Sequence, residues 1–494
     1  MQKRMPLVLK QQAIQQPEKI AFEFRSHKKT YGDVYRQATA LAGYLQQFNY
    51  DKDTIIGIFM DNHDDFPVIY FGIQLAGLIA MPINTKLAPA EIAYIIDHSE
   101  VKAIFCDTAL TPKLDATGMP IAQRFTTEDL PEIYTHAPFE AASIEDEDIA
   151  VIMYTSGTTG KPKGVMLSYR AVYEATSQWV ESVGLTAQDR MFICTPLFHC
   201  AGLHVFLTPI VMVGGTFIIE EAFSPTQTPT WLRDTQATIF FGVPAMYMLL
   251  LNNEDFSAFD LSHVRLFAYG AAPMPYELVS KLRKLFPHVS LQNFYGQTEN
   301  APCSTTLKGN DVLEKIGSVG KPPTEKTAVR IVGPDGESVP NGVVGEIIVK
   351  GPQTMTGYLR NPQETAHALR DGWLFTGDLG RLDDEGFLYI VDRQKDMLIR
   401  GGENVYPVEV EEVLFQMPAV LEAAVVGVPH PIYGEVPKAY ICLKEGQTLT
   451  VEELTAHCVE RLAKYKIPVE MELMDALPRN ASGKVLKHVL RSST

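Results

Sequence analysis

Short apolar runs alternate with amphipathic segments over residues 7–106 of the sequence. Because the runs are bounded by polar or turn-forming residues, they predict buried strands at residues 19–24, 54–60, 78–83 and 101–106. The segments between them predict helices at residues 7–16, 35–47 and 64–75, with Thr30 as a candidate cap of the second helix. Strands that alternate with helices form βαβ units, so this pattern favours largely parallel sheets.

The pattern continues towards residue 300 and then changes. Further strands are predicted at residues 149–153, 191–199, 216–219, 237–241, 264–268 and 290–294. Past about residue 320, the runs at residues 329–332 and 345–350 alternate in polarity and are separated by turn sequences, which predicts a small antiparallel β region. Near the C-terminus the pattern predicts helices at residues 409–415 and 451–462 and strands at residues 423–427 and 439–443.

A chain of 494 residues exceeds the size of one hydrophobic core, so more than one domain is expected. The predicted fold class is α/β. A large N-terminal domain, residues 1–393, would hold two mostly parallel α/β sheets and the small antiparallel β region. A small α/β C-terminal domain, residues 394–494, would follow the short polar segment Gln394-Lys395-Asp396.

Composition argues against several classes of protein. The net charge is −16 and there is no basic tract, which argues against nucleic-acid binding. The six cysteines are scattered without a Cys-x-x-Cys pair, as in proteins with reduced thiols. The apolar stretch at residues 5–9 is too short for a secretion signal, and Pro209 and Gly214 interrupt the one at residues 206–219. We therefore expect a cytoplasmic protein without an integral membrane segment; peripheral membrane contact and a homodimer stay open.

One loop is rich in hydroxyls, glycines and lysines. Residues 154–164 have the sequence YTSGTTGKPKG and follow the predicted strand at residues 149–153. Glycines let successive backbone N–H groups converge on an anion, while hydroxyls and lysines add donors and positive charge. The Walker pattern does not fit, because Pro162 stands where Ser or Thr is required and Thr155 replaces the first glycine. The loop therefore predicts a polyphosphate site of another kind.

This loop resembles the phosphate loop of the adenylate-forming superfamily, which includes acyl-CoA synthetases, luciferases and the adenylation domains of peptide synthetases. Further clusters follow in the order typical of that superfamily: Tyr295-Gly296-Gln297-Thr298-Glu299, residues 372–378, Asp392-Arg393, residues 401–407 and residues 478–484. Each cluster alone has an ordinary structural explanation, but their joint order does not. From about residue 10 to its end, the chain is similar to a full-length acyl-CoA synthetase.

The resemblance implies that the protein uses ATP, Mg²⁺ and coenzyme A with a small-molecule carboxylic acid, and forms acyl-CoA, AMP and pyrophosphate. The implied phosphate-binding residues are Thr155, Ser156, Gly157, Thr158, Thr159 and Lys163. Tyr295 would stack on the adenine beside Gly270, Ala271, Ala272 and Gly296, and Asp378 and Arg393 would bind the ribose.

Four residues would be catalytic by the same resemblance. Thr298 would bind the α-phosphate, Glu299 would bind Mg²⁺, and Lys484 would lie between the acid's carboxylate and the α-phosphate. The attack joins two anions, so cations and donors at these positions suit the chemistry. His199 would be a gate between the nucleotide site and the thiol tunnel. The alternative is a structural histidine in the core, with its hydrogen bonds made inside the protein.

The resemblance also implies a second half-reaction and a mobile C-terminal domain. That domain would rotate about Lys395 and withdraw Lys484. It would then present Gly401 and Gly402, whose missing side chains allow close approach of a narrow thiol arm.

The acid itself is less well defined by the sequence. The pocket is expected near Cys200, Gly202, His204, Phe241, Gly242, Ala271, Gln297 and Ala301, none of which is a lysine or an arginine. Amino-acid-activating relatives carry an aspartate where this chain has His199, which argues against an amino acid. Residues 241–247 resemble fatty-acid enzymes, which favours a medium- or long-chain fatty acid. The alternatives are an aryl acid of the o-succinylbenzoate or cinnamate type, transfer to a carrier protein instead of CoA, and a non-catalytic ATP-binding module.

Overall fold

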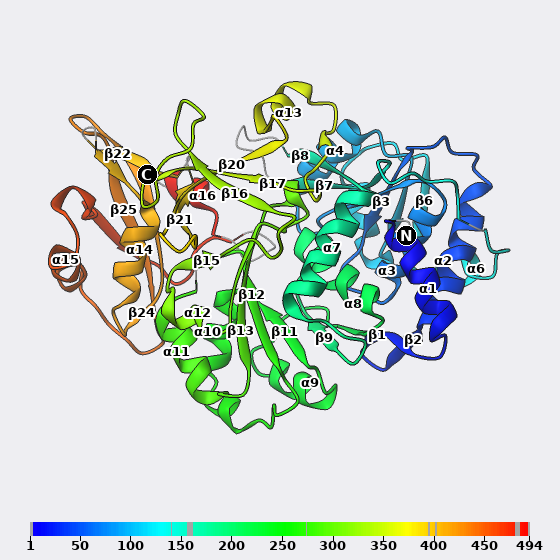
Figure 1. The fold of residues 1–494 in the computed structure, drawn as a ribbon, viewed down its shortest axis with the longest axis horizontal. Helices are drawn as coiled ribbons and strands as arrows, with labels where there is room; N and C mark the ends of the chain where they lie inside the picture. Colours follow the sequence, from blue (N-terminus) through cyan, green and yellow to red (C-terminus); the bar gives the residue numbers. More distant parts are fainter. Residues whose placement is uncertain are drawn as a thin grey trace.

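The structure is a computed structural model that describes residues 3–139, 141–155, 162–272, 274–393, 396–400, 403–479 and 485–492. Four β-sheets organise these residues. Figure 1 shows the N-terminal part, blue to cyan, at the opposite end of the molecule from the C-terminal part, orange to red.

An eight-stranded sheet combines six strands between residues 190 and 308 with two strands between residues 20 and 30. It is parallel at its centre, while β1 and β2 at one edge and β13 and β14 at the other are antiparallel. Strands β10 and β11 are buried along their length, as expected where helices cover both faces of a sheet. Its order is β14 (Thr305–Lys308), β13 (Ser290–Tyr295), β12 (Leu266–Gly270), β11 (Ile239–Gly242), β9 (Arg190–Ile193), β10 (Thr216–Ile219), β1 (Ile20–Phe24) and β2 (His27–Thr30).

A seven-stranded sheet forms the N-terminal end of the molecule (Figure 1). Its central pairs are parallel, and β7, β8 and β18 add an antiparallel edge. The expectation of two mostly parallel sheets is thus confirmed. The order is β18 (Gly357–Tyr358), β8 (Lys163–Ser168), β7 (Ile149–Thr155), β4 (Ile79–Pro82), β3 (Ile55–Phe59), β5 (Ala103–Cys106) and β6 (Gln123–Thr126).

Two smaller sheets follow in the chain. The predicted antiparallel region consists of β15 (Ser318–Gly320), β21 (Leu388–Arg393), β20 (Trp373–Leu382), β17 (Gly345–Lys350), β16 (Ala328–Val332) and, beside β20, β19 (Leu369–Arg370). The C-terminal sheet consists of β23 (Glu403–Val405), β22 (Leu398–Arg400), β25 (Gly434–Leu443), β24 (Val420–His430) and β26 (Glu470–Leu473). The C-terminal sheet has its own cores, which include Val425 and Val426.

Helices cover these sheets, and their ends follow local chemistry. Thr30 caps α2 with a capping box: its hydroxyl accepts from the Asp33 N–H, and the Asp33 carboxylate accepts from the Thr30 N–H. The α-helices are α1 (Met5–Gln15), α2 (Tyr31–Gln46), α3 (Asp65–Leu75), α4 (Pro89–Ser99), α5 (Thr111–Asp115), α6 (Leu130–Ile133), α7 (Tyr169–Val183), α8 (Thr208–Val213), α9 (Thr228–Asp234), α10 (Pro244–Asn252), α11 (Tyr276–Leu285), α12 (Asp311–Glu314), α13 (Pro362–Ala368), α14 (Pro407–Phe415), α15 (Val451–Val459) and α16 (Lys487–Ser492).

One predicted strand is wrong in its second half. The run at residues 191–199 was expected to be a single strand, but β9 ends at Ile193. Pro196 has no N–H to donate to a sheet ladder, and a π-helix, η2 (Ala201–Leu207), follows almost at once. A π-helix carries one extra residue per turn and occurs often at functional sites. His199 and Cys200 therefore lie in a turn that enters this helix.

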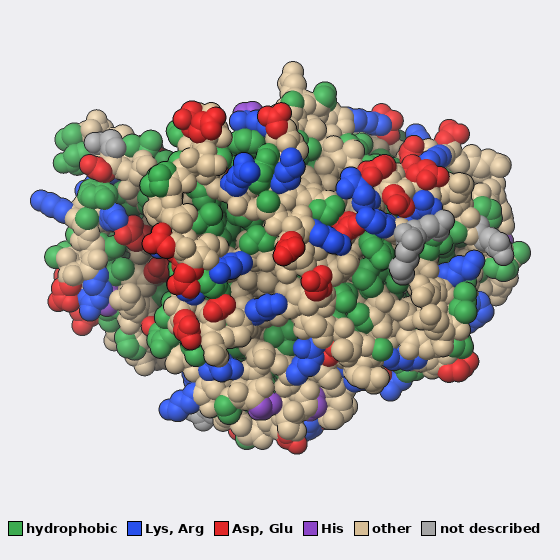
Figure 2. All heavy atoms as spheres, viewed as in Figure 1, with side chains coloured by type: hydrophobic (Ala, Val, Ile, Leu, Met, Phe, Trp, Pro, Cys, Tyr) green, Lys and Arg blue, Asp and Glu red, His purple; other side chains and the backbone are tan. Residues whose placement is uncertain are grey.

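The surface agrees with the composition. Figure 2 shows lysine and arginine side chains mixed with aspartate and glutamate over the face in view. None of the helices in the described ranges is both long and apolar enough to cross a lipid bilayer.

Candidate functional site

The carboxyl ends of β12 and β13 lie side by side and carry the predicted adenine-binding residues. Gly270 ends β12 and pairs with Phe294 of β13, and a Cβ at Gly270 would lie 2.4 Å from the Phe294 carbonyl oxygen. Any larger residue would therefore push the two strands apart. Ala271 follows with φ at +68°, in the left-handed region, and both Ala271 and Ala272 are exposed. Ligands of open α/β sheets bind at this edge.

Asp378 on β20 is held at the same edge by two side chains, one from the last residue of β13 and one from two residues later. The Tyr295 hydroxyl donates to Asp378 Oδ2 at 2.7 Å, and the Gln297 amide donates to the same oxygen at 2.8 Å. Gln297 also donates to the Thr376 carbonyl oxygen. Asp378 is 5% exposed, and Arg393 lies opposite it in the β20–β21 ladder. The carboxylate predicted to bind ribose is therefore oriented by the tyrosine predicted to bind adenine.

Glu299 lies in a short 3₁₀ turn, η4 (Thr298–Asn300), directly after β13. The Tyr358 hydroxyl donates to Glu299 Oε1 at 2.9 Å, and the Met355 N–H donates to the Glu299 carbonyl oxygen at 2.8 Å. Burial raises the pKa of Glu299 above its ordinary value, while the Tyr358 hydroxyl and the charge of Lys163 oppose that shift.

Lys163 begins β8, and its side chain is 13% exposed. Its ammonium lies 4.9 Å from the centroid of the Tyr358 ring and pairs with the Glu364 carboxylate on α13. Thr155, the last residue of β7, is its partner across the β7–β8 hairpin. The hairpin that flanks the predicted phosphate loop thus contacts the same tyrosine as Glu299.

Thr298 and His199 meet through Cys200. The Thr298 hydroxyl donates to Cys200 Sγ at 3.1 Å, and Cys200 Sγ lies 3.8 Å from His199 Nδ1. His199 is partly exposed, whereas Cys200 is 5% exposed. Burial raises the pKa of Cys200 to about 11, so the thiol stays protonated at neutral pH. The residue predicted to gate the thiol tunnel therefore adjoins the residue predicted to bind the α-phosphate.

The predicted acid-pocket residues include His204, which the structure buries completely. Its Nε2 lies 3.3 Å from the Tyr70 hydroxyl, and its Nδ1 has no hydrogen-bond partner among the described residues. Burial lowers the pKa of His204 to about 3, so the ring is neutral at physiological pH. Phe206 and Phe241 pack against each other, with their ring centroids 4.3 Å apart and their planes tilted by 39°. This region therefore offers aromatic surface without a positive charge.

Several predicted site residues lie outside the described ranges or are described only in part. Ser156, Gly157, Thr158, Thr159, Lys395, Gly401, Gly402 and Lys484 lie outside them, and Arg393 is described in its strand but not in its side chain. The structure links Lys163 to Glu299 through Tyr358, and Tyr295 to Asp378 directly. Thr298 and Glu299 lie in one 3₁₀ turn, three and four residues after Tyr295.

Tyr358 and Glu364 were missed by sequence reasoning. No periodicity signals their role, because Tyr358 meets Glu299 only through the fold, across 59 residues of chain. The glycine before Tyr358 is the one local signal: Gly357 has a φ of +155°, and a Cβ there would lie 2.8 Å from the Thr365 methyl group.

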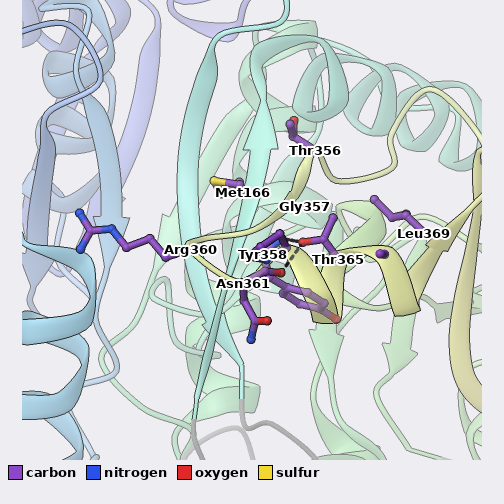
Figure 3. Close-up of a pocket in the computed structure, with 10 residues that line it drawn as sticks. Met166, Thr356, Gly357, Tyr358, Arg360, Asn361, Thr365 and Leu369 are labelled. Carbon is purple, nitrogen blue, oxygen red and sulfur yellow. Dashed lines mark hydrogen bonds between the residues drawn. The ribbon is translucent and has the colours of Figure 1, made fainter.

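A pocket of about 400 Å³ borders Tyr358 and α13 (Figure 3). Its polar groups are already engaged: Thr365 Oγ1 accepts from the Tyr358 N–H, and Asn361 Oδ1 accepts from the Glu364 N–H. Figure 3 shows Arg360 extending away from the pocket, where it donates to Glu100 and the His98 carbonyl oxygen. We therefore assign this pocket no ligand.

Comparison with known proteins identifies the family. Residues 9–359 match the family described as AMP-binding enzyme, and residues 409–484 match the AMP-binding enzyme C-terminal domain. The chain is 36% identical over 463 residues to a feruloyl-CoA synthase of Amycolatopsis sp, covering 94% of this chain and 93% of that protein. It is 37% identical over 486 residues to the 2-succinylbenzoate–CoA ligase of Bacillus licheniformis, covering 98% and 99%. It is 34% identical over 474 residues to a long-chain-fatty-acid–CoA ligase of Mycobacterium tuberculosis, covering 94% and 93%.

Solved structures agree with these matches. The o-succinylbenzoate CoA synthetase of Bacillus subtilis in complex with its acyl-adenylate intermediate has a TM-score of 0.89 at 33% identity, covering 98% of this chain and 97% of that chain. The same enzyme in complex with ATP and magnesium ion has a TM-score of 0.87 at 33% identity, covering 97% and 98%. The matched profiles, the near full-length relatives and the common fold together establish that this chain belongs to the AMP-binding enzyme family, with both its N-terminal and its C-terminal domain.

Proposed function

We propose that the protein is an AMP-forming carboxylic acid–CoA ligase. The acid and ATP form an acyl-adenylate and pyrophosphate, and the CoA thiol then displaces AMP to give acyl-CoA. The observation that carries the proposal is a pair of contact groups at the edge of the sheet: Tyr358 links Lys163 to Glu299, and Tyr295 holds Asp378. Residues 295–299 connect the two groups along the chain. One cation and two carboxylates lie there on separate elements, which is the set needed for a phosphate chain, a metal ion and a ribose.

The chain's own residues divide the work of the first step. Lys163 and the loop after Thr155 would bind the β- and γ-phosphates, and Thr298 would donate its hydroxyl to the α-phosphate. In the structure that hydroxyl rests on Cys200 Sγ, a weak acceptor that a phosphate oxygen displaces readily. Tyr295 would present one face to the adenine while its hydroxyl holds Asp378 for the ribose.

Glu299 is suited to hold Mg²⁺. Its carboxylate supplies hard oxygen ligands, it is partly buried, and it lies near the lysine expected at the phosphates. When bound, the metal would neutralise phosphate charge. The Tyr358 hydroxyl holds the Glu299 carboxylate in place through Oε1 before ATP arrives.

The acid we propose is a medium- or long-chain fatty acid. The expected pocket residues are mainly apolar or small, and His204, the one imidazole among them, is neutral because its pKa is about 3. A second carboxylate in the acid would therefore find no positive charge there, which disfavours dicarboxylates. The second candidate is an aryl acid whose only charge is the reacting carboxylate. The Phe206–Phe241 pair and the similarity to a feruloyl-CoA synthase favour it.

We also propose that residues 1–393 and 394–494 act as two domains, the second of which rotates between the half-reactions. The family matches leave the interval 360–408 between them, and this interval contains Lys395. After rotation, Gly401 and Gly402 would line the path of the thiol arm, with His199 at its inner end.

An acid-library screen tests the reaction and the acid together. With ATP and Mg²⁺, we expect pyrophosphate release without CoA for one group of acids, and sustained AMP formation only when CoA is added. The kcat/KM of the enzyme should be higher with fatty acids than with cinnamates or benzoates. Products measured as ADP and phosphate would contradict the proposal, and AMP that accumulates with a carrier protein but not with CoA would favour the carrier-protein alternative.

Glu364 gives a second test: its carboxylate pairs with Lys163 and would therefore compete with the ATP phosphates for this ammonium. A partly exposed ion pair stabilises by about 0.2–1 kcal/mol. Glu364→Gln should therefore lower the KM for ATP by roughly 1.5- to 5-fold, since this energy no longer opposes binding. The matched control is Glu385→Gln, which removes the same charge from the exposed pair with Lys315 and should leave the KM for ATP unchanged. An unchanged KM in Glu364→Gln would mean that Lys163 does not meet ATP.

A further inference from the structure

Tyr358 contacts two of the groups on which the proposed function depends. Its hydroxyl donates to Glu299 Oε1 at 2.9 Å, and the Lys163 ammonium lies 4.9 Å from its ring centroid. The residue is 8% exposed. The hydroxyl and the face of one rigid ring therefore serve a carboxylate and an ammonium at once.

The backbone fixes the position of that ring. Tyr358 pairs with Val165 in the antiparallel β8–β18 ladder, and Val165 is two residues after Lys163 on the same strand. The Tyr358 N–H donates to Thr365 Oγ1 at 2.9 Å, and Thr365 in turn donates to the Asn361 carbonyl oxygen at 2.8 Å, as the dashed lines in Figure 3 show. The β8–β18 ladder and helix α13 thus both fix the position of Tyr358.

The same segment also holds the backbone of Glu299, because the Met355 N–H donates to its carbonyl oxygen. Both ends of Glu299 are therefore anchored to residues 355–358. Without the hydroxyl, its carboxylate would be free to rotate towards Lys163 and neutralise it.

We propose that Tyr358 is a positioning residue for the metal-bound nucleotide. Its hydroxyl fixes Glu299 Oε1, which would leave Oε2 as the oxygen available to Mg²⁺, and its ring would keep the Lys163 ammonium apart from that carboxylate. This inference rests on the proposed function, because it assumes that Glu299 binds Mg²⁺. Groups that orient a metal ligand in this way commonly contribute 10- to 100-fold to metal affinity.

The test is Tyr358→Phe, which keeps the ring and removes the hydroxyl. The direct measurement is Mn²⁺ binding, by electron paramagnetic resonance, to the full-length protein saturated with a non-hydrolysable ATP analogue. We expect the dissociation constant for Mn²⁺ to rise by about 10- to 100-fold. The Mg²⁺ concentration for half-maximal ATP–pyrophosphate exchange should rise in parallel, with the KM for the acid unchanged.

Tyr295→Phe is the matched control, since it removes the hydroxyl that donates to the other carboxylate, Asp378. It should raise the KM for ATP and leave the Mn²⁺ affinity of the analogue complex unchanged. Equal Mn²⁺ affinities in wild type and Tyr358→Phe would overturn the inference, as would equal losses in the two tyrosine variants.

Glu299→Gln separates a metal effect from a folding defect. In a Glu299→Gln background, adding Tyr358→Phe should not weaken Mn²⁺ binding further, whereas independent losses in the double variant would overturn the inference. A wild-type protein that exchanges pyrophosphate with no acid at all would instead overturn the proposed function, and this inference with it.

Discussion

Replacing Lys484 with alanine is expected to slow acyl-adenylate formation by about 10²–10³-fold, the usual loss on removing one group that stabilises transition-state charge. Transfer of a supplied acyl-adenylate to CoA should be nearly unchanged, because Lys484 would have left the site with the C-terminal domain before the thiol arrives. Two assays measure the effect: ATP–pyrophosphate exchange for the first half-reaction, and acyl-CoA formation from synthetic acyl-adenylate for the second.

The matched control for this variant is Lys464→Ala. Lys464 lies in the same domain and is exposed, so the same change in charge should leave both half-reactions unaltered. Lys487 would not serve as a control, because its ammonium is 2.8 Å from Glu411 and its loss would disturb the C-terminal core. If Lys484→Ala slows both half-reactions equally, the two steps share one arrangement of the domains and the proposed alternation is wrong.

Much of the fold follows from local sequence pattern. The strands predicted at residues 216–219 and 345–350 agree with β10 and β17 to the residue, because each is a short run bounded by turn-forming residues. The helix after Thr30 begins immediately at Tyr31, earlier than the apolar periodicity suggested, because the capping box and not the periodicity decides where it starts. The predicted C-terminal strands are longer in the structure, where β24 and β25 pair along their whole lengths.

The candidate site could be predicted in its parts but not in its connections. Glu299, Asp378 and Lys163 are predicted because their motifs resemble those of the adenylate-forming superfamily, in which the corresponding positions bind metal, ribose and phosphate. The contacts of these residues join positions far apart in the chain: 59 residues separate Tyr358 from Glu299, and 83 separate Tyr295 from Asp378. Such contacts depend on which sheet edges the fold brings together, and no periodicity encodes that.

The turn at Cys200 illustrates the same limit. An apolar run led to a strand prediction through residue 199, yet a π-helix begins at Ala201. Its position becomes intelligible only in three dimensions, where Cys200 adjoins both His199 and Thr298, the latter 98 residues away. The strand prediction thus fails at the residues that adjoin the candidate functional site.

The last prediction concerns the hinge, whose flanks the structure describes on both sides of residues 394–395. Before the hinge, Asp392 accepts from the Val408 N–H at the start of α14. After it, Asp396 pairs with Arg491 of α16 at 2.8 Å. Burial alone would lower the pKa of Lys487 on the same helix, but the carboxylates of Glu411 and Asp392 raise it, so this lysine stays charged beside the hinge. The Asp392–Val408 contact joins the two proposed domains and must break if one rotates against the other.

Lys395→Pro is therefore expected to uncouple the two half-reactions. Proline fixes φ near −65° and removes a backbone donor, while distant side chains keep their places. A backbone forced out of its preferred region costs about 1–3 kcal/mol, so the orientation that needs another φ should become roughly 5- to 150-fold rarer. We expect acyl-adenylate formation to persist and its transfer to CoA to fall by that factor. A single-turnover reaction with labelled ATP, followed by a CoA chase, measures both steps on one sample.

Lys395→Ala is the control, because it removes the side chain but leaves φ free. In this variant the acyl-adenylate should be transferred to CoA at the wild-type rate. Wild-type chase kinetics in Lys395→Pro would place the hinge elsewhere, and equal defects in the two variants would assign the effect to the lysine side chain and not to the backbone.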